Sequence, residues 1–381
     1  MTTTLTETQN QVMDSLWIDV NLKALMSNLA QIRYLIGKDV KITSVVKANG
    51  YGHGISEISE CLAPFVDYLG VANAKEAQRI REFVKEAPIL IFGGIQPEEV
   101  AVCLEQNFSV VLSSLDHAKK LQEYAEIYSK PLKVHVKVDT GMGRMGFVLE
   151  EALNAIKILV DNPSFDVEGL MTHFPVAEEV NHPKTNEQIK EFQLLIKELK
   201  NQGIDIPLQH AANSSGLINF PDSHFNMVRP GLSLYGVSSN VNSNKVVSLE
   251  PVLNLKTRVH LIKHLKKGQS VSYGCHFVLP KDGYVAVLPV GYGHGYPYAL
   301  SQKGRVLIQG KSFPVCGNVC MDYTLLYLGS DDSIKEGDEV VLIGQQGEEV
   351  ITCNELAEKA NTIPYEILTR LSSAIPRYYI S

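Results

Sequence analysis

Short runs of apolar, often β-branched residues alternate with amphipathic stretches from residue 20 to about residue 235. Apolar runs of this length are typical of strands that are buried on both faces. We expect eight such strands, at residues 41–46, 68–72, 89–92, 109–112, 132–138, 167–172, 207–211 and 225–228. Eight strands that alternate with helices in one run predict an α/β fold, a (β/α)8 barrel of the TIM type.

The amphipathic stretches between these strands predict the helices of the barrel. Clear examples are residues 73–86, 114–129 and 184–203. The last of them ends in Gly203, and glycine is the residue most often found just past the C-terminus of a helix.

The pattern changes after about Val237, where Gly-rich turns separate alternating strands. We expect these strands at residues 252–262, 270–274, 284–293, 305–318, 324–329 and 338–344, followed by short helices around 354–361 and 364–373. This pattern predicts a second, mainly antiparallel β domain. The expected domains are therefore a barrel over residues 1–240 and a β domain over 241–381, with a linker at 242–251. The first 15 to 19 residues, with a strand at 15–20, could join the β domain instead.

Length, charge and composition narrow the kind of protein. A chain of 381 residues exceeds the roughly 250 to 300 residues that one core usually serves, which fits two domains. The net charge of -7 disfavours nonspecific nucleic-acid binding, and no apolar run approaches the roughly 18 residues of a membrane span. The polar N-terminus lacks a secretory signal, so we expect a cytoplasmic protein. The six cysteines form no CxxC pair, and we expect no metal site.

Polar residues that end or follow the expected barrel strands form the candidate site. In such a barrel these positions lie on the face where active sites are built. The residues found there are Lys47, Lys137, Arg144, His173, Asn213, Ser214, Arg229 and Gly231. We expect these distant segments to converge at one mouth of the barrel.

Lys47 indicates the chemistry of this mouth. A lysine at the end of an apolar strand is desolvated, which favours its neutral amine and makes it a nucleophile that can form a Schiff base with an aldehyde. The loops after strands seven and eight are the recurrent phosphate site of this fold, and here they supply Ser214, amides near Gly231 and the helix start after Asn213. Alone, Lys47 would more often be a solvated strand-end residue. Together with a phosphate site, it favours pyridoxal phosphate (PLP) as the cofactor.

Several longer motifs carry a resemblance to a known family. They are VVKANGYGHG, VDTGMGRMGF, THF, HAANSSG, VRPGLSLYG, VSYG, GYGHGY, CMD and PYEI, in this order from residue 45 to residue 367. Together they resemble the ordered motifs of the bacterial alanine racemases, PLP-dependent enzymes of the barrel class. The resemblance implies a homodimer with active sites shared between its subunits. It also implies an enzyme that interconverts L-alanine and D-alanine and supplies D-alanine for peptidoglycan.

The resemblance further implies the catalytic residues. Lys47 would bind PLP and act as one base, and Tyr273 of the partner subunit would act as the second base. Arg229 would face the pyridine nitrogen, and His173 would form a hydrogen bond with Arg229. Arg144 would lie near the phenolate oxygen of the cofactor and would help to bind the substrate.

Other residues would surround the cofactor and the substrate. The phosphate would be held by Tyr51, Tyr365, Ser214 and the amide of Gly231, next to Asn213. Met321 would contact the substrate, and Tyr292 and Asp322 would line its entrance. Lys137, beside Arg144, stands at a position that is often carbamylated in the family.

The chain departs from the family pattern at two places. Asn318 stands where the family usually has arginine, and Gly293 with His294 where it usually has alanine and aspartate. Both places lie at the expected entrance. They therefore bear on substrate preference or on subunit contacts rather than on PLP binding.

The implied roles fit the chemistry of racemisation. Removing the α-proton on one face and returning a proton on the other requires two acid–base groups on opposite sides of a planar intermediate. Lys47 and Tyr273 can supply them. Arg229 does not give up its proton, so it leaves the pyridine nitrogen unprotonated. The ring is then a weaker electron sink, which suppresses transamination and elimination.

Three other functions fit part of the sequence. A racemase that also accepts serine or another small amino acid would have the same motifs. A barrel-class PLP decarboxylase would typically carry glutamate at the pyridine nitrogen, which Arg229 and Tyr273 disfavour. A noncatalytic PLP carrier would generally lack the second domain.

Overall fold

The computed structural model describes residues 14–238 and 247–381, which form two compact units. The barrel unit contains Val20–Leu253, Ile363–Thr369 and Tyr379–Ser381. The β unit contains the residues up to Asp19, Asn254–Thr362 and Arg370–Tyr378. The expected domain boundary at residue 240, part of the expected linker and the polar N-terminus at residues 1–13 lie outside the described residues.

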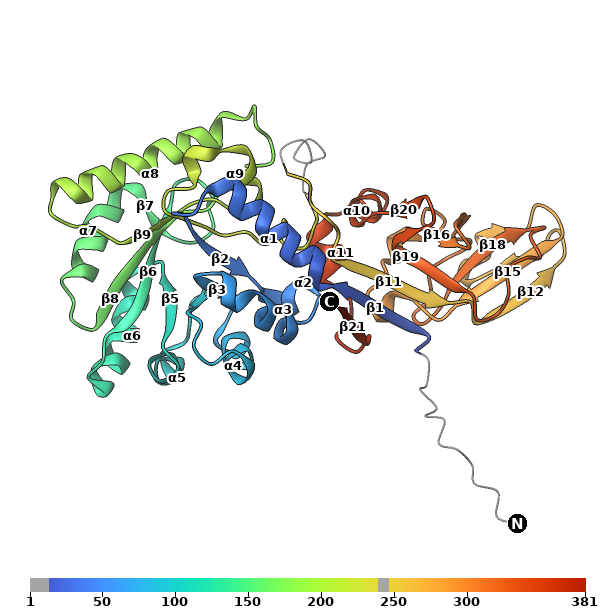
Figure 1. Ribbon diagram of the computed structural model, residues 1–381, viewed down its shortest axis with the longest axis horizontal. Coiled ribbons are helices and arrows are strands. Elements are labelled where there is room, and N and C mark those ends of the chain that lie inside the picture. Colours follow the sequence, from blue (N-terminus) through green and yellow to red (C-terminus); the bar gives the residue numbers. More distant parts are fainter. Residues whose placement is uncertain (1–13, 239–246) are drawn as a thin grey trace, which may run out of the picture. The chain divides into compact units, whose positions relative to one another are not determined.

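The barrel unit is built on a parallel sheet that closes on itself (Figure 1). In the described part of the chain, its strands follow the order β5-β4-β3-β2-β10-β9-β8-β6, and the pairing of β5 with β6 closes the barrel. The strands are β2 (Lys41–Val45), β3 (Tyr68–Val71), β4 (Ile89–Ile91), β5 (Phe108–Leu112), β6 (Leu132–Asp139), β8 (Phe165–Met171), β9 (Leu208–His210) and β10 (Met227–Val228), with the short β7 (Phe147–Val148) beside β6. All eight expected strands are present, and the predicted (β/α)8 barrel is confirmed.

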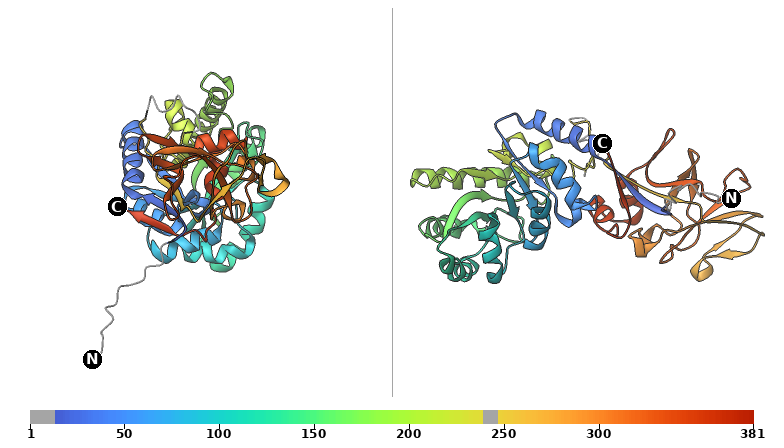
Figure 2. Two further views of the ribbon diagram at one scale, coloured as in Figure 1. Left: turned by 90° about the vertical axis from the view of Figure 1, so that its right-hand side faces the viewer. Right: turned by 60° about the horizontal axis from the view of Figure 1, so that its bottom comes forward.

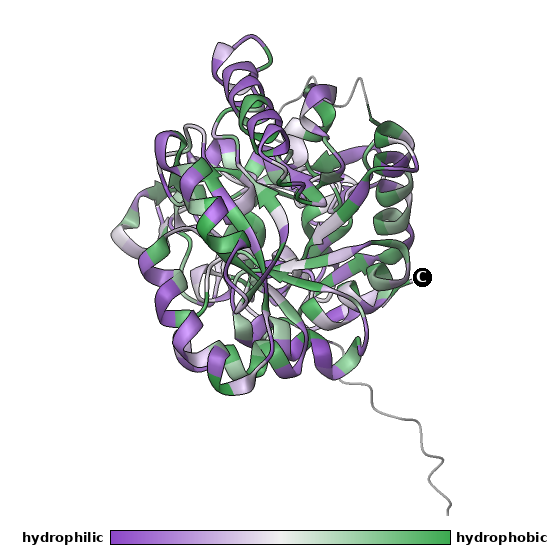
Figure 3. Cartoon of the chain, turned by 90° about the vertical axis from the view of Figure 1, so that its left-hand side faces the viewer, coloured by the Kyte–Doolittle hydropathy of each residue, from purple (hydrophilic) through white to green (hydrophobic). Residues whose placement is uncertain are grey.

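Helices surround this sheet, with many hydrophilic residues on their outer faces (Figure 3). They are α1 (Leu22–Ile36), α2 (Lys47–Tyr51), α3 (Ile55–Leu62), α4 (Ala74–Phe83), α5 (Val100–Glu105), α6 (Leu115–Tyr128), α7 (Leu149–Val160), α8 (Pro183–Asn201), α9 (Ser214–Asn219) and α11 (Pro364–Thr369). The expected helices correspond to α4, α6 and α8, with ends that differ by a few residues. None of the helices in the described residues combines the length and apolar character needed to cross a membrane.

Side-chain caps explain where two of these helices begin. Asn73 accepts the amide of Glu76 at 3.0 Å before α4, and Ser114 accepts the amide of His117 at 3.2 Å before α6. These caps satisfy amides that have no partner within the helix. One cluster of buried apolar side chains joins five barrel strands, namely Leu90 of β4, Val111 of β5, Met171 of β8, Leu208 of β9 and Met227 of β10.

The β unit is mainly antiparallel, as predicted. Its largest sheet follows the order β17-β16-β19-β11-β1-β21, with β20 beside β19, and smaller sheets contain β12-β15-β18 and β13-β14. The right view of Figure 2 shows β1, in blue, among the strands of this unit. The elements are β1 (Leu16–Asn21), β11 (Leu253–Arg258), β12 (Leu261–Leu265), β13 (Ser270–Val271), β14 (Phe277–Val278), β15 (Gly283–Leu288), β16 (Arg305–Ile308), β17 (Lys311–Pro314), β18 (Thr324–Gly329), β19 (Glu339–Gln346), β20 (Glu349–Ile351), α10 (Cys353–Ala360) and β21 (Arg377–Ile380).

Three described segments beyond residue 240 belong to the barrel unit, although we expected them in the β domain: residues 247–253, Ile363–Thr369 and Tyr379–Ser381. Most of β1 belongs to the β unit, the alternative that we expected for the first 15 to 19 residues, because its backbone pairs there between β11 and β21. In turn, α11 belongs to the barrel unit, although we expected it in the C-terminal domain. Its Leu368 carbonyl approaches Gly52 so closely that a Cβ at Gly52 would lie 2.2 Å from that oxygen. The chain therefore contributes separate segments to each unit.

Candidate active site

The turn that carries Lys47 has an unusual backbone. It directly follows β2, and its next residues, Ala48 and Asn49, have φ angles of 53° and 55°. Such left-handed residues cost free energy and persist only where their surroundings hold them. Glu76 provides this support, because its carboxylate accepts the amide of Ala48 at 2.7 Å and that of Ala72 at 2.8 Å. Lys47 is thus held by a turn that is tied to the end of β3.

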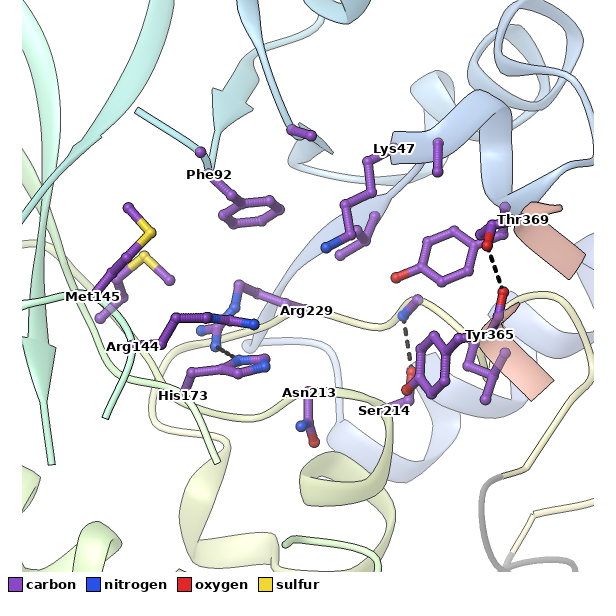
Figure 4. A pocket seen from close by; sticks show the side chains of 18 of the residues that line it. Lys47, Phe92, Arg144, Met145, His173, Asn213, Ser214, Arg229, Tyr365 and Thr369 are labelled. Atoms are coloured by element: carbon purple, nitrogen blue, oxygen red, sulfur yellow. Dashed lines mark hydrogen bonds between the residues drawn. The ribbon is translucent and has the colours of Figure 1, made fainter. Parts of the chain in front are cut away.

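A cavity of about 500 Å³ lies at the ends of the barrel strands. Cavities of this size suit small organic ligands. Figure 4 shows Lys47 and Arg229 in this cavity, with Ser214 and Tyr365 on one side and Arg144 and His173 on the other. The structure brings together Tyr365, which we expected in the C-terminal domain, and all the expected barrel residues: Lys47, Tyr51, Lys137, Arg144, His173, Asn213, Ser214, Arg229 and Gly231.

The described residues that line this cavity include four cationic side chains and no carboxylate. Burial and the nearby Arg144 lower the pKa of Lys47, although Glu76 opposes this shift. Burial, Arg144 and Arg229 lower the pKa of Lys137 to about 8. Both amines therefore become neutral more readily than an ordinary lysine. The cavity as a whole attracts anions.

The buried guanidinium of Arg229 donates to four acceptors. Nη2 donates to the carbonyl of Thr172 at 2.7 Å, the carbonyl of Ala211 at 2.9 Å and Nδ1 of His173 at 3.2 Å. Nη1 donates to Nδ1 of His210 at 2.8 Å. Burial lowers the pKa of Arg229 to about 9, so this side chain is still protonated at neutral pH. Burial and Arg229 lower the pKa of His173 well below its usual value, which leaves its Nδ1 able to accept.

Arg144 lies in a loop that folds back on the end of β6. Oδ1 of Asp139 accepts the amides of residues 141–143 at 2.9, 2.8 and 3.1 Å. A Cβ at Gly146 would lie 2.7 Å from the amide nitrogen of Asp139. The close backbone approach at Gly146 and the hydrogen bonds from the loop amides to Asp139 restrain the loop conformation. In this conformation Arg144 lines the cavity.

Hydroxyl groups form a small cradle on the opposite side of the cavity. Oγ of Ser214 accepts the amides of Gly231 at 2.9 Å and Ser233 at 3.2 Å. A Cβ at Gly231 would lie only 2.7 Å from the hydroxyl of Tyr51, so glycine is needed for this approach. The ring of Tyr365 lies 6.0 Å from that of Tyr51. The Gly231 amide, which we expected to face a phosphate, thus orients the Ser214 hydroxyl.

Asn213 lines the cavity but uses its amide within the protein. Its Oδ1 accepts the amide of Gly216 at 2.9 Å as the cap of α9, and its Nδ2 donates to the carbonyl of Phe174 at 3.3 Å. It therefore orients the segment that begins with Ser214.

The remaining expected site residues belong to the β unit. The side chain of Tyr273 is 75% exposed, and those of Tyr292, Met321 and Asp322 are exposed as well. The amide of Tyr292 donates to the carbonyl of Cys320 at 3.0 Å, so the structure brings the Tyr292 turn next to Met321 and Asp322. None of these four residues is among the described residues that line the barrel cavity.

The two departures from the family pattern are also in the β unit. Asn318 is buried, and its Nδ2 donates to the carbonyl of Tyr273 at 2.9 Å. The hydroxyl of Ser272 donates to the carbonyl of Asn318 at 2.6 Å. Nδ1 of His294 accepts the amide of Gly291 at 3.2 Å. Asn318 is therefore connected to the turn that presents Tyr273.

Sequence reasoning missed three polar residues behind Arg229, namely His210, His135 and Glu168. The two imidazoles are fully buried, and both lie in barrel strands. A signal was available, because HVKV, EGLMT and PLQHA place polar residues inside otherwise apolar strands. Buried polar groups require hydrogen-bond partners. Because these strands belong to one barrel, the polar residues on them can serve as partners for one another.

This arrangement is typical of one class of enzyme site. A lysine with a lowered pKa can attack a carbonyl group, and the cations and hydroxyls around it can bind an anionic group. The fold and the cavity are therefore those of a (β/α)8-barrel enzyme whose site suits an anionic ligand with a carbonyl group.

Comparisons with known proteins identify the family. Family models for the alanine racemase N-terminal and C-terminal domains match residues 20–239 and 252–379. An alanine racemase of Desulforamulus reducens is 39% identical over 96% of this chain and 99% of its own length. The solved alanine racemase of Clostridium difficile 630 has a TM-score of 0.91 at 34% identity, over 97% of both chains. The Bacillus anthracis alanine racemase solved with bound L-Ala-P has a TM-score of 0.89 at 34% identity, over 96% of this chain and 95% of that one. The chain belongs to the alanine racemase family, which confirms the resemblance found in the sequence.

Proposed function

We propose that this protein is a PLP-dependent alanine racemase that uses Lys47 and Tyr273 as its two bases. As a member of the alanine racemase family the chain is an isomerase. The observation that carries the proposal is that Lys47, with its lowered pKa, and the buried Arg229 lie in one cationic cavity. Alanine is the substrate in this proposal because the chain matches relatives named alanine racemase over nearly their whole length.

The residues of the cavity fit PLP. Ser214, Tyr51 and Tyr365 offer hydroxyls for the phosphate, and Gly231 leaves a space that a Cβ would close. Asn213 and the Gly231 amide keep Ser214 in place. The cations at the other end of the cavity suit the phenolate oxygen of the cofactor and the carboxylate of an amino acid.

PLP would supply an aldehyde group for the substrate amine and a conjugated ring that stabilises negative charge at Cα. Lys47 accepts or donates the α-proton on one face of the substrate, and Tyr273 does so on the other face. Arg229 would donate a hydrogen bond to the ring nitrogen and keep its own proton. His173 accepts from Arg229 and so supports this orientation.

Arg144 binds the substrate carboxylate in this proposal, and Lys137 lies near it. With a pKa of about 8, Lys137 has a share of neutral amine at pH 7. The neutral amine can attack carbon dioxide, forming an N–C bond and releasing one proton to water. The resulting carbamate is an anion that would pair with Arg144.

The proposal includes a homodimer in the cytoplasm that supplies D-alanine for peptidoglycan. Tyr273 of one subunit serves the cavity of the other, with Met321 at the substrate and Tyr292 and Asp322 at the entrance. The exposure of Tyr273, Tyr292 and Met321 supports this arrangement. Aromatic residues and methionine are enriched where protein surfaces meet.

Racemase activity is tested directly by circular dichroism. Purified protein with PLP should convert L-alanine and D-alanine to the same mixture, because the enantiomers have equal free energies. Lys47→Ala should abolish turnover, whereas Lys190→Ala on the exposed face of α8 should have no effect. Absence of turnover in protein that has bound PLP would contradict the proposal.

The role of Tyr273 is tested with Tyr273→Phe, which removes the hydroxyl and keeps the ring. Racemisation should fall by about 10²- to 10⁴-fold, the usual contribution of an acid–base group. In deuterated water, exchange of the α-hydrogen should persist for the enantiomer whose proton faces Lys47. The control, Tyr34→Phe, changes an exposed tyrosine of α1. Equal loss of exchange for both enantiomers, together with loss of PLP, would indicate a structural role.

A racemase with a broader range is the second candidate, because Asn318 and His294 depart from the family at the expected entrance. A turnover screen over small amino acids, serine included, would separate the two candidates. Comparable kcat/KM for serine and alanine would favour the broader enzyme.

A further inference from the structure

Behind Arg229, a row of buried hydrogen bonds connects side chains of the neighbouring strands β9, β6 and β8. Nη1 of Arg229 lies 2.8 Å from Nδ1 of His210, and Nε2 of His210 lies 2.8 Å from Nδ1 of His135. Nε2 of His135 lies 3.1 Å from Oε1 of Glu168. The exposed fraction is 0% for both histidines and 14% for the Glu168 side chain. Arg229 lines the cavity, and the other three are not among its described lining residues.

Only one set of tautomers satisfies every contact in this row. The protonated Arg229 can only donate, so Nδ1 of His210 must accept and its Nε2 must carry the proton. Nε2–H of His210 then donates to Nδ1 of His135, whose own Nε2–H donates to the Glu168 carboxylate. If either imidazole were reversed, two N–H groups would face each other. Burial lowers the pKa of both histidines, which is consistent with two neutral rings.

The backbone around Glu168 is shaped for this contact. Val134 of β6 pairs with Val167 of β8, whereas the next residue, His135, pairs with Gly169, so Glu168 is the extra residue of a β-bulge. A bulge redirects the side chain of the inserted residue. At Gly169 a Cβ would lie 2.2 Å from Nδ1 of His135, so glycine leaves the room that the imidazole occupies.

Further donors hold the Glu168 carboxylate in place. Ser109 donates to Oε1 through a short hydrogen bond, and the Tyr68 hydroxyl donates to the same oxygen at 3.3 Å. Hydrogen bonds from His135 and Ser109 lower the pKa of Glu168 although burial opposes this shift, so the carboxylate is ionised at neutral pH. An ionised carboxylate can only accept, so each hydrogen bond of the row is donated in the direction from Arg229 to Glu168.

We propose that Glu168 is a positioning residue for catalysis, acting through His135 and His210 on Arg229. Together with Arg229, it stabilises the tautomers that present an acceptor to Nη1, and it would thereby keep the guanidinium in the orientation that faces the ring nitrogen of PLP. A positive group at one end of the row is matched by a negative group at the other, across two neutral rings. The inference rests on the proposed function, because the position of Arg229 matters only if the cavity holds PLP.

A purely structural role is the competing explanation, since buried polar networks also specify packing. The two explanations differ in what replacement of Glu168 should do. Glu168→Ala removes the acceptor, and Glu168→Gln keeps an acceptor but loses the charge. Asp166→Asn on the same strand is a matched control, because Asp166 is exposed and loses the same charge.

The first measurement uses the PLP-free protein and ¹⁵N NMR of its histidine rings. The wild-type protein should show His135 and His210 as Nε2–H tautomers. Without the carboxylate, the Arg229 guanidinium is free to turn away from His210, so Glu168→Ala should populate the Nδ1–H tautomer of His210. Glu168→Gln should do so to a smaller extent, and Asp166→Asn should not. If Glu168→Ala fails to fold, the partial shift in Glu168→Gln carries the test. Unchanged tautomers in a folded Glu168 variant, or Nδ1–H at His210 in the wild type, would overturn the proposal.

The second measurement is racemisation with saturating PLP. In Glu168→Ala, kcat should fall by on the order of 10- to 100-fold, the range known for residues that orient metal ligands, with a smaller change in KM. Side transamination, followed by absorbance, should take a larger share of turnover. A shifted tautomer with unchanged kcat and unchanged side reaction would make the row structural only. If the wild type shows the expected tautomers but racemises no amino acid, the proposed function fails and the tautomer assignment stands.

Discussion

At the scale of single residues, the charges at the barrel mouth decide what each side chain can do. Lys47 and Lys137 both lie at the ends of apolar strands, near Arg144. Burial and this neighbouring cation lower both of their pKa values. The position of each lysine was predictable from the pattern of the strands. The size of the effect was not, because it depends on cations from other strands and loops.

The lowered pKa of Lys137 predicts a dependence of stability on pH. The pKa of Lys137 is about 8 in the folded chain and 10.5, the ordinary lysine value, in the unfolded chain. Between these two pH values the unfolded chain binds a proton that the folded chain does not. The free energy of unfolding therefore rises with pH in this window, and the contribution is absent below about pH 8. Relative to Lys137→Met, the wild type should gain on the order of 3 kcal/mol across the window.

This prediction is checked by denaturant unfolding of the PLP-free protein at several pH values from 7 to 10, in buffer without carbonate. Lys190→Met, at an exposed position of α8, is the control and should show no such gain. A difference between the wild type and Lys137→Met that stays constant with pH would show that Lys137 titrates normally.

At the scale of elements, two turns with unusual backbones present the expected bases. The Lys47 turn has left-handed residues that Glu76 supports. The Tyr273 turn has φ angles of 64° at Ser272 and 52° at Cys275, and Asn318 supports it. In both cases the supporting side chain comes from a distant part of the sequence. Local sequence therefore indicated a reactive residue but not the geometry that holds it.

Asn318→Ala tests the support of the Tyr273 turn. It removes one hydrogen bond to a backbone carbonyl, a loss worth about 1 to 3 kcal/mol where the acceptor is buried. Racemisation should fall about 10-fold or more, because the phenol is no longer held in one place. The measurement is kcat/KM for both enantiomers in the single variants and in the double variant with Tyr273→Phe. If Asn318 acts through Tyr273, Asn318→Ala should lower kcat/KM little further in the Tyr273→Phe background. Losses in kcat/KM that multiply fully in the double variant would contradict this.

At the scale of the whole molecule, the expected catalytic residues are divided between two units. The cavity and Lys47 belong to the barrel unit, and the exposed Tyr273 belongs to the β unit. Family membership and the exposure of Tyr273 are the basis for proposing a second subunit. A dimer with twofold symmetry would contain two equivalent shared sites.

Mixing two inactive variants tests the shared site. Lys47→Ala and Tyr273→Phe subunits, combined by refolding or coexpression, should regain activity, since each mixed dimer has one site with both bases. Random mixing makes half of the dimers mixed, with half of their sites complete, so about a quarter of wild-type activity is expected. The measurement is racemisation, with mass spectrometry to verify the mixed dimer. Inactive mixed dimers would exclude catalysis by Tyr273 across subunits.

The sequence by itself determined the eight barrel strands, the change to antiparallel strands and the residues that converge at the mouth. These features follow from local rules, because burial on two faces demands apolar runs and strand ends of a parallel barrel share one face. The motifs around Lys47, Arg144 and Arg229 were equally local, and they were sufficient to indicate the family.

Only the tertiary structure decided how distant segments support one another. It placed α11 with the barrel, β1 with the β sheet and Asn318 under the Tyr273 turn. It also aligned Glu168 and His135 behind Arg229 by means of a bulge. The physical reason is that hydrogen bonds and desolvation depend on which groups meet in space, and the spacing of residues along the chain does not specify those meetings.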